Sequence, residues 1–264
     1  MQHLTDFYTA RNEHARLLTR HGQVEYLTTM RYIDRYLTAG ARVLEIGAGT
    51  GRYSHALAQQ GYSVAAVELL QHNIDFFIAH TQPGEQVTVH QGDARDLSAF
   101  GDDTYDITLI LGPLYHLYTM QGKCQVIREA LRVTRPGGVI FAAYCISDGA
   151  ILNAGFVRNR FDLAEYIERG LIDPVTFQAT SSPTEVFDVV RREYINELMA
   201  AFPVQRLHYL ATDLLAEHLR EVLAEMDEET FALYLRYHFA ICERPDMVGF
   251  TNHTLDIFRK QAPT

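Results

Sequence analysis

The stretch Val43-Leu44-Glu45-Ile46-Gly47-Ala48-Gly49-Thr50-Gly51-Arg52 decides the fold of this chain. Residues 43–46 are suited to a buried strand, three glycines follow at alternate positions, and a helical pattern begins at once. A glycine turn after a buried strand lets a ligand approach the backbone where a side chain would clash. The N–H groups at the start of the next helix favour an electron-rich or anionic group of that ligand. The stretch therefore predicts a nucleotide-type cofactor site at the carboxyl edge of a parallel sheet.

The spacing of the glycines separates two classes of cofactor. A dinucleotide-binding turn has glycine at its first, third and sixth positions. Here the third glycine, Gly51, is at the fifth position and Arg52 occupies the sixth. Glu45 lies two positions before the first glycine, and this acidic-x-Gly-x-Gly-x-Gly pattern resembles the first motif of class I S-adenosylmethionine-dependent methyltransferases. Turn glycines in other α/β proteins are the competing interpretation, so motifs further along the chain must support the resemblance.

Four further segments follow in the order that this family shows. They are a β-rich run ending in an acid (62–68), a strand ending in Gly-Asp-Ala (86–94), a buried strand and loop (105–116), and a helix end with a Pro-Gly-Gly turn and strand (131–141). The resemblance implies a doubly wound α/β fold whose seven-stranded, mostly parallel sheet has the order 3-2-1-4-5-7-6, with the last strand antiparallel. It also implies S-adenosyl-L-methionine as cofactor and S-adenosyl-L-homocysteine as product.

The resemblance assigns cofactor contacts to residues at the tips of the first four strands. Glu68 would accept both ribose hydroxyls, because a carboxylate has several acceptor sites. Asp93 would accept the adenine amino group, and the N–H of Ala94 would reach the ring. Glu45 would fix the glycine loop or meet the methionine amino group, and Arg20 would pair with the methionine carboxylate. The predicted cofactor-binding set is Arg20, Glu45, Gly47, Ala48, Gly49, Thr50, Gly51, Glu68, Leu69, Asp93, Ala94, Leu111 and Gly112.

Plainer structural interpretations of these residues stay open. A solvated strand end also carries residues such as Glu68, and Asp is a favoured turn or helix cap, which describes Asp93 equally well. Arg20 has the character of an ordinary exposed side chain.

His116 and Tyr115, on the loop after the fourth strand, are the candidate catalytic residues. The sulfonium methyl is already activated, so catalysis consists chiefly of positioning a nucleophile in line and excluding water. A base is needed only where the acceptor carries a proton, and imidazole titrates near neutral pH. Tyr115 would stack on or line the acceptor. Packing roles are the alternative for both residues, and we expect no metal.

Composition favours a soluble enzyme. The chain has 264 residues, 47% of them hydrophobic, enough for the core of one domain with an elaboration. It has no run of about eighteen apolar residues and no signal-peptide pattern at its start, so we expect no membrane association. Its three cysteines, Cys124, Cys145 and Cys242, are widely separated. Reduced thiols and a cytoplasmic location are therefore expected.

The charge and one loop favour a small-molecule acceptor. The net charge is −10, and a protein that grips nucleic acid usually carries a basic stripe. Residues 111–115 also lack the Asp/Asn/Ser-Pro-Pro-aromatic pattern of enzymes that methylate base amino groups. Three rivals stay open: a methyltransferase of tRNA or protein, a noncatalytic cofactor-binding module and a dehydrogenase, the last disfavoured by Arg52. A surface cluster of Arg158, Arg160, Arg191 and Arg192 would favour the first. The sequence is also compatible with a homodimer.

Periodicity divides the chain into helices over 1–40, which would cover the cofactor site, and a methyltransferase domain over 41–264 with a helical lid at about 146–182. Tyr8, Arg20 and His21 would close over the cofactor. The expected strands are 42–47, 63–68, 86–91, 105–111, 138–144, 204–211 and 254–258. The expected helices are 5–21, 24–38, 149–158, 162–169, 184–200, 213–226 and 228–242, with others starting near 51, 71 and 120.

Overall fold

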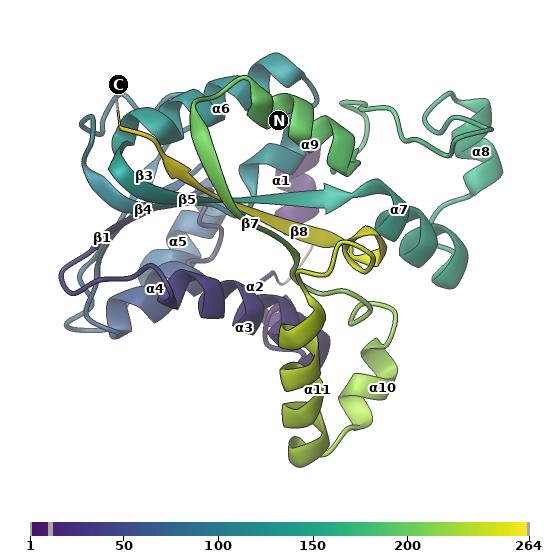
Figure 1. Cartoon of the computed structure of the whole chain (residues 1–264), viewed down its shortest axis with the longest axis horizontal. Coiled ribbons are helices and arrows are strands. Elements are labelled where there is room, and N and C mark those ends of the chain that lie inside the picture. The colour runs from purple at the N-terminus through teal and green to yellow at the C-terminus, as the bar shows by residue number, and fades with distance from the viewer. Residues whose placement is uncertain (1, 10–12, 263–264) are drawn as a thin grey trace.

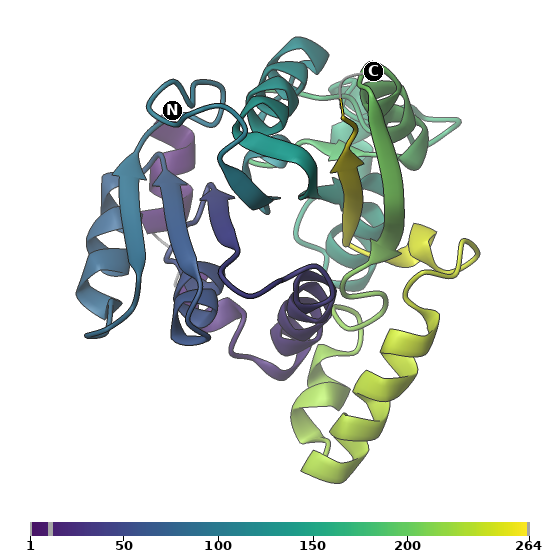
Figure 2. The same ribbon diagram turned by 60° about the vertical axis from the view of Figure 1, so that its left-hand side comes forward.

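Parallel strands form the centre of the molecule, and the computed structural model describes residues 2–9 and 13–262. The strands are β1 (Arg42–Ile46), β2 (Ser63–Glu68), β3 (Val87–Gln91), β4 (Tyr105–Ile110), β5 (Thr134–Ile146), β6 (Val189–Val190), β7 (Val204–Ala211) and β8 (His253–Lys260). They follow the order β3-β2-β1-β4-β5-β8-β7, and β6 pairs with the end of β5 (Figures 1 and 2). β8 is antiparallel to both β5 and β7. The predicted strand order is confirmed, with β7 and β8 as its sixth and seventh strands.

Helices cover both faces of the sheet. The helical segments are α1 (Gln2–Thr9), α2 (Glu13–Arg16), α3 (Arg20–Asp34), α4 (Arg52–Gln59), α5 (Gln71–His80), η1 (Pro113–His116), α6 (Met120–Val133), α7 (Ser147–Ala150), the π-helix η2 (Ile151–Val157), α8 (Leu163–Glu168), α9 (Arg192–Ala200), α10 (Arg220–Glu225), α11 (Glu228–Ile241) and η3 (Val248–Phe250). In Figure 1, α3 and α4 lie on one side of the sheet, whereas α6 and α9 lie on the other.

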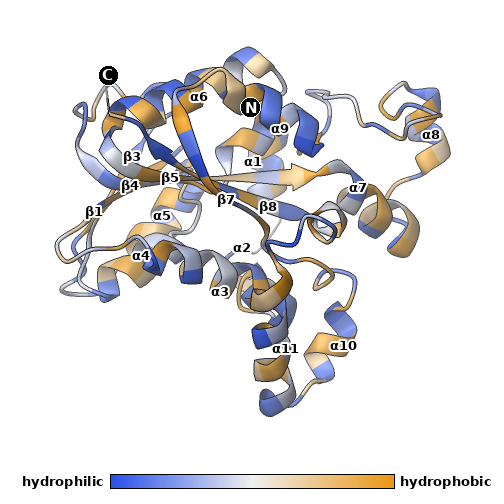
Figure 3. Ribbon diagram, in the orientation of Figure 1, coloured by the Kyte–Doolittle hydropathy of each residue, from blue (hydrophilic) through white to orange (hydrophobic). Residues whose placement is uncertain are grey.

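Side chains of the central strands alternate between the two helical layers, because successive residues of a strand point to opposite faces. Val43 and Ile107 pack in the cluster that includes α3 and α4, whereas Leu44 and Ile110 pack in the cluster that includes α6 and α9. A strand buried on both faces reads as a continuous apolar run, which is why the buried part of β1, residues 43–46, is apolar except for Glu45. Figure 3 shows the hydrophobic colour continuing along β5 to its end beside α7.

The helix predicted over 184–200 is wrong in its first half. Residues 189–190 form β6, and α9 begins only at Arg192. β5 extends to Ile146, so its last two residues offer backbone partners to Val189 and Val190. Two β-branched residues suit such a pairing better than they suit a helix.

Three other helix boundaries also differ from the prediction. In the helix expected over 5–21, the described residues form α1 and α2 but residues 17–19 are not helical, and residues 10–12 lie outside the described residues. α3 begins at Arg20 because Thr19 caps it, accepting a hydrogen bond from the Gly22 N–H at 3.2 Å. The helix expected over 213–226 is helical only in α10. The preceding turn is held by the buried carboxylate of Asp213, which accepts hydrogen bonds from the backbone N–H groups of Asn252 and His253.

The predicted insertion, 146–182, contains α7, η2 and α8, and Figure 1 places α8 at the outer edge of the molecule. α10 and α11 project from the sheet beside α3 (Figures 1 and 2). None of the helices in the described residues is long and apolar enough to cross a bilayer.

Candidate active site

One cavity of about 580 Å³ lies at the carboxyl ends of the parallel strands. Its volume is in the range of small-molecule sites. α1 contributes His3, Leu4 and Tyr8 to its wall. The cavity brings together these predicted residues: Glu45, Gly47, Ala48, Gly49, Thr50, Glu68, Leu69, Asp93, Ala94, Leu111, Gly112, Tyr115 and His116. Arg20, Gly51 and His21 do not line it.

All three glycines of the turn have positive φ, but the surroundings that a side chain would meet differ from one to the next. A Cβ at Gly47 would lie 2.5 Å from Cγ of Pro113, and one at Gly51 would overlap the ring of Phe77. A Cβ at Gly49 would meet nothing within 4 Å. Only Gly49 therefore keeps a space open, whereas Gly51 is required for packing against α5.

Glu68 ties the glycine turn to the tip of β2. Its carboxylate accepts hydrogen bonds from the Gly49 N–H at 2.8 Å, the Leu70 N–H at 2.9 Å and Asn73 Nδ2 at 3.1 Å. Only 6% of Glu68 is exposed, and the residue lines the cavity. Two carboxylate oxygens can accept about four hydrogen bonds, so capacity remains for a ligand hydroxyl.

Glu45 is a buried carboxyl at the end of β1. It accepts hydrogen bonds from the Ser54 N–H at 2.9 Å and from Ser54 Oγ. Burial raises the pKa of Glu45 to about 8, and the Ser54 hydrogen bonds offset only part of this effect. The carboxyl is therefore largely protonated at neutral pH unless a cation comes close.

Asp93 is held by Arg95, two residues further along the loop. Its carboxylate accepts hydrogen bonds from the Arg95 N–H at 2.9 Å and from the Arg95 guanidinium at 2.5 Å and 3.0 Å. These hydrogen bonds hold the pKa of Asp93 below its usual range. The carboxylate is thus ionised, caps its own turn and lines the cavity at once.

His116 and Tyr115 lie on η1, against a neighbouring aromatic ring, Phe187. The carbonyl oxygen of Val186, 2.9 Å from His116 Nδ1, can only accept, so Nδ1 carries the proton. His116 Nε2 therefore accepts the hydrogen bond that joins it to Tyr8 Oη at 2.8 Å. Burial lowers the pKa of His116 to about 4, so the imidazole is neutral at pH 7. Tyr115 donates its hydroxyl to the Leu111 carbonyl at 2.8 Å.

The segment that covers this loop lies just beyond the predicted lid. Pro183 and Val186 line the cavity, whereas no residue of 146–182 does. The segment is fastened by Asp188, whose N–H donates to the Tyr115 carbonyl at 2.8 Å and whose carboxylate pairs with Lys123. Both charged side chains are almost completely buried.

Arg20 is a correction to the predicted cofactor set. Its guanidinium pairs with Glu228 at 2.5 Å and lies over the ring of Phe231, 4.5 Å from the centroid. α11 thus holds Arg20 away from the cavity. Arg16 of α2 does line the cavity, and it makes two hydrogen bonds to Glu25 at 2.6 Å and 3.1 Å.

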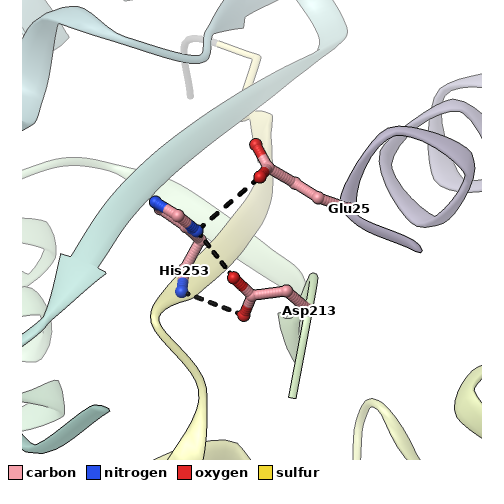
Figure 4. A group of neighbouring side chains, drawn as sticks. All are labelled: Glu25, Asp213 and His253. Atoms are coloured by element: carbon pink, nitrogen blue, oxygen red, sulfur yellow. Dashed lines mark hydrogen bonds and ion pairs between the residues drawn. The ribbon is translucent and has the colours of Figure 1, made fainter. Parts of the chain in front are cut away.

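Glu25, Asp213 and His253 form a cluster that was not predicted, and two of its members, Glu25 and His253, line the cavity (Figure 4). Asp213 Oδ2 lies 2.7 Å from His253 Nδ1, and Glu25 Oε2 lies 3.7 Å from the same nitrogen. Glu25 comes from α3, Asp213 follows β7 and His253 begins β8. No local motif connects three residues so far apart in sequence, so only the tertiary structure could reveal the cluster.

The strand order and the glycine turn define a doubly wound protein that binds a nucleotide-type cofactor at the carboxyl edge of its sheet. Residues 43–138 match the family model described as a methyltransferase domain. This match confirms the predicted resemblance over these residues and implies S-adenosylmethionine as cofactor. The fold is shared with known S-adenosylmethionine-dependent methyltransferase structures.

Three known proteins illustrate the similarity. A demethylmenaquinone methyltransferase of Clavibacter sepedonicus is 30% identical over 168 residues, 63% of this chain and 61% of that protein. A ubiquinone biosynthesis O-methyltransferase of Methylocella silvestris is 32% identical over 128 residues, 48% of each chain. A methyltransferase structure from Methanosarcina mazei has a TM-score of 0.57 at 19% identity and covers 88% of this chain and 98% of its own. The matches span about half to three-fifths of these curated relatives' length.

Proposed function

We propose that this protein transfers a methyl group from S-adenosylmethionine to a small molecule bound in the same cavity. The observation that carries the proposal is that the cavity extends past the glycine turn. Glu45, Gly49 and Glu68 line one part of it, over β1 and β2, whereas Ala143 and Leu255 line another, over β5 and β8. A cofactor over the first part leaves the second part for an acceptor.

The residues fit the cofactor in chemistry as well as in position. The open face of Gly49 admits a ligand against the backbone, and Glu68 retains acceptor capacity for ribose hydroxyls. Glu45 would be ionised by a positively charged group nearby, which suits a ligand carrying an ammonium and a sulfonium. Asp93 and Ala94 are proposed for the adenine end. When bound, this cofactor supplies a methyl carbon that is already activated for nucleophilic attack.

His116 and Tyr115 are proposed to act at the acceptor. His116 is unprotonated at neutral pH, as a base must be, its Nε2 accepts a hydrogen bond from Tyr8, and both residues line the cavity. A pKa of about 4 makes the imidazole a weak base, so this pair suits an acceptor whose own proton is acidic. α1 and the segment 183–188 would exclude water while the methyl group moves.

Two rival functions receive less support. The four arginines expected to mark a macromolecular surface are partly used within the chain: Arg191 pairs with Asp148 at 2.7 Å, and Arg192 lies over Tyr209. A noncatalytic binding module would be favoured by a filled space behind Tyr115 and His116, but both residues border the open cavity.

The proposal is tested by incubating the protein with S-adenosylmethionine and a fractionated metabolite extract and measuring S-adenosylhomocysteine release. We expect release that depends on a low-molecular-mass fraction. Gly49→Val should abolish it, because the side chain would occupy the open space at the turn. Gly40→Val is the matched control: Gly40 also has positive φ and no atom within 4 Å of its would-be Cβ, but it does not line the cavity. Equal cofactor affinity for both variants by calorimetry would remove the assigned site.

A further inference from the structure

Glu25 and His253 lie in a part of the cavity wall that no proposed cofactor contact explains, and Asp213 pairs with His253. β8 is antiparallel to β5, so its first residue, His253, pairs with Cys145 near the carboxyl end of β5. The last strand thus brings an imidazole to the edge where the parallel strands end. This is the region proposed above for the acceptor.

The orientation of the His253 ring is fixed from one side. Asp213 Oδ2 binds Nδ1, while Asp213 Oδ1 accepts the N–H groups of Asn252 at 3.1 Å and His253 at 3.2 Å and the Thr251 hydroxyl. Only 2% of the Asp213 side chain is exposed, so the carboxylate cannot turn to water. Because a carboxylate accepts, Nδ1 must carry a proton.

The opposite nitrogen of the ring, Nε2, is available to a ligand. In Figure 4 it lies on the side of the ring away from both carboxylates. None of the hydrogen bonds among the described residues involves Nε2, the side chain is 24% exposed, and His253 lines the cavity. Asp213 therefore orients the ring so that Nε2 is available to a ligand in the cavity.

The charges of the cluster favour an imidazolium. Burial by itself would lower the pKa of His253, but Glu25 and Asp213 outweigh it and hold that pKa well above its ordinary value. Arg16, paired with Glu25, balances the second carboxylate. Two carboxylates, one guanidinium and one imidazolium then form a neutral group, in which the Nε2–H of His253 is left for a ligand.

A divalent cation is the competing occupant, since the three side chains could each supply one ligand atom. A metal would have to displace the proton on His253 Nδ1 and compete with Arg16 for Glu25. Both carboxylates already have cationic partners, so the cluster is balanced without an ion. The arrangement therefore suits a hydrogen-bond donor better than a metal centre.

We propose that His253 binds the methyl acceptor through its Nε2–H and selects acceptors that carry an anionic oxygen, either a carboxylate or a phenolate. This inference rests on the proposed function and names the class of its substrate. A charge-assisted hydrogen bond of this kind is shorter and stronger than a neutral one and discriminates against an uncharged isostere.

The test uses the whole protein saturated with S-adenosylhomocysteine and two pairs of probes: benzoate with benzamide, and 4-nitrophenolate with 4-nitroanisole. ¹⁵N NMR of the histidine side chains follows Nε2 of His253, which is assigned with the His253→Gln variant. We expect at least one acid to shift this nitrogen saturably at pH 7 and to bind at least tenfold more tightly than its neutral partner. The pair that discriminates tells whether the group is a carboxylate or a phenolate.

His253→Ala should weaken binding of the acid about 10–100-fold, the range for loss of a hydrogen bond to a charged group. The affinity for S-adenosylhomocysteine should stay within about threefold of that of wild type. His253→Gln should keep some binding but lose the preference for acids, and His72→Ala, an exposed residue of α5, should change neither. The inference is overturned if neither acid is preferred to its partner, or if Zn²⁺ binds wild type tightly and His253→Ala does not. Failure of wild type to bind S-adenosylhomocysteine would instead overturn the proposed function.

Discussion

Single residues at the strand tips combine a structural role with a place in the cavity wall. Glu68 is the clearest case, because one carboxylate holds the N–H of Gly49 and also borders the cavity. Asp93 likewise caps its own turn with Arg95 as partner. The structural and the functional interpretations of these residues are therefore compatible, since a carboxylate has more acceptor sites than one partner uses.

His116→Ala is expected to lower kcat by about 100-fold or more, the usual range for loss of a base, while cofactor affinity stays within about threefold. The reason is that His116 contacts Tyr8 and Val186 rather than the glycine turn. Turnover is measured by S-adenosylhomocysteine release and affinity by calorimetry, with His72→Ala as the exposed control. Parallel losses in kcat and in affinity would show that the residue supports the cofactor pocket instead.

Binding of S-adenosylmethionine is expected to release a proton at pH 7. The pKa of Glu45 is about 8 in the free protein, so its carboxyl is protonated there, and a cationic ligand favours the ionised form. Affinity should therefore rise between pH 6 and pH 8, by up to about tenfold per pH unit. Calorimetry in buffers of different ionisation enthalpy measures the proton. Glu45→Gln should abolish the release, and a proton count of zero in wild type would contradict the assignment.

At the scale of elements, a buried ion pair fastens the covering segment, residues 183–188, to α6 beside the loop after β4. Lys123 on α6 pairs with Asp188, and it also donates to the Leu117 carbonyl. Ser181 donates to the same carboxylate. These contacts around Asp188 join α6, the loop after β4 and the segment before β6. They also position the carbonyl oxygen of Val186, which accepts the hydrogen bond from His116 Nδ1.

Lys123→Met is expected to lower the free energy of unfolding by about 3–5 kcal/mol, because it leaves the buried Asp188 without a cation. The double variant Lys123→Met/Asp188→Asn should recover part of this loss. Arg169→Met, which removes an exposed pair with Glu165, should cost less than about 1 kcal/mol. Urea unfolding measures all three. If Lys123→Met lowers the free energy of unfolding as little as Arg169→Met does, the Lys123–Asp188 ion pair contributes little to stability.

At the scale of the whole molecule, distant parts of the chain enclose one cavity. α1 and α3 come from the start of the chain, the glycine turn and η1 from its middle, and His253 from near its end. The parallel order of β1 to β5 gathers the strand tips at one edge, and the antiparallel β8 adds its first residue there. A ligand in this cavity would contact elements from the beginning, the middle and the end of the chain.

S-adenosylhomocysteine at about 100 times its Kd is therefore expected to stabilise the folded state by about 2.7 kcal/mol. For a chain of this size that corresponds to a rise in Tm of roughly 5–10 °C. Differential scanning calorimetry measures the shift, with adenosine as a ligand that lacks the methionine portion. Gly40→Val should retain the rise and Gly49→Val should lose it. An unchanged Tm in wild type would argue against a cofactor enclosed by these elements.

The sequence by itself determined the glycine turn and the alternation of strands and helices, because these features depend on local spacing and on periodicity within short segments. The strand order and the domain class followed from the family resemblance that these motifs carry. The sequence also predicted the cavity-lining residues at the tips of β1 to β4, from Glu45 to His116. It placed Arg20 wrongly, since an arginine's partner depends on which helix packs beside it, here α11. Only the tertiary structure showed that Glu25, Asp213 and His253 lie together, and that residues 184–191 are not helical. Those outcomes depend on contacts between residues far apart in the chain, where pairing with β5 and burial beside other charges outweigh local preference.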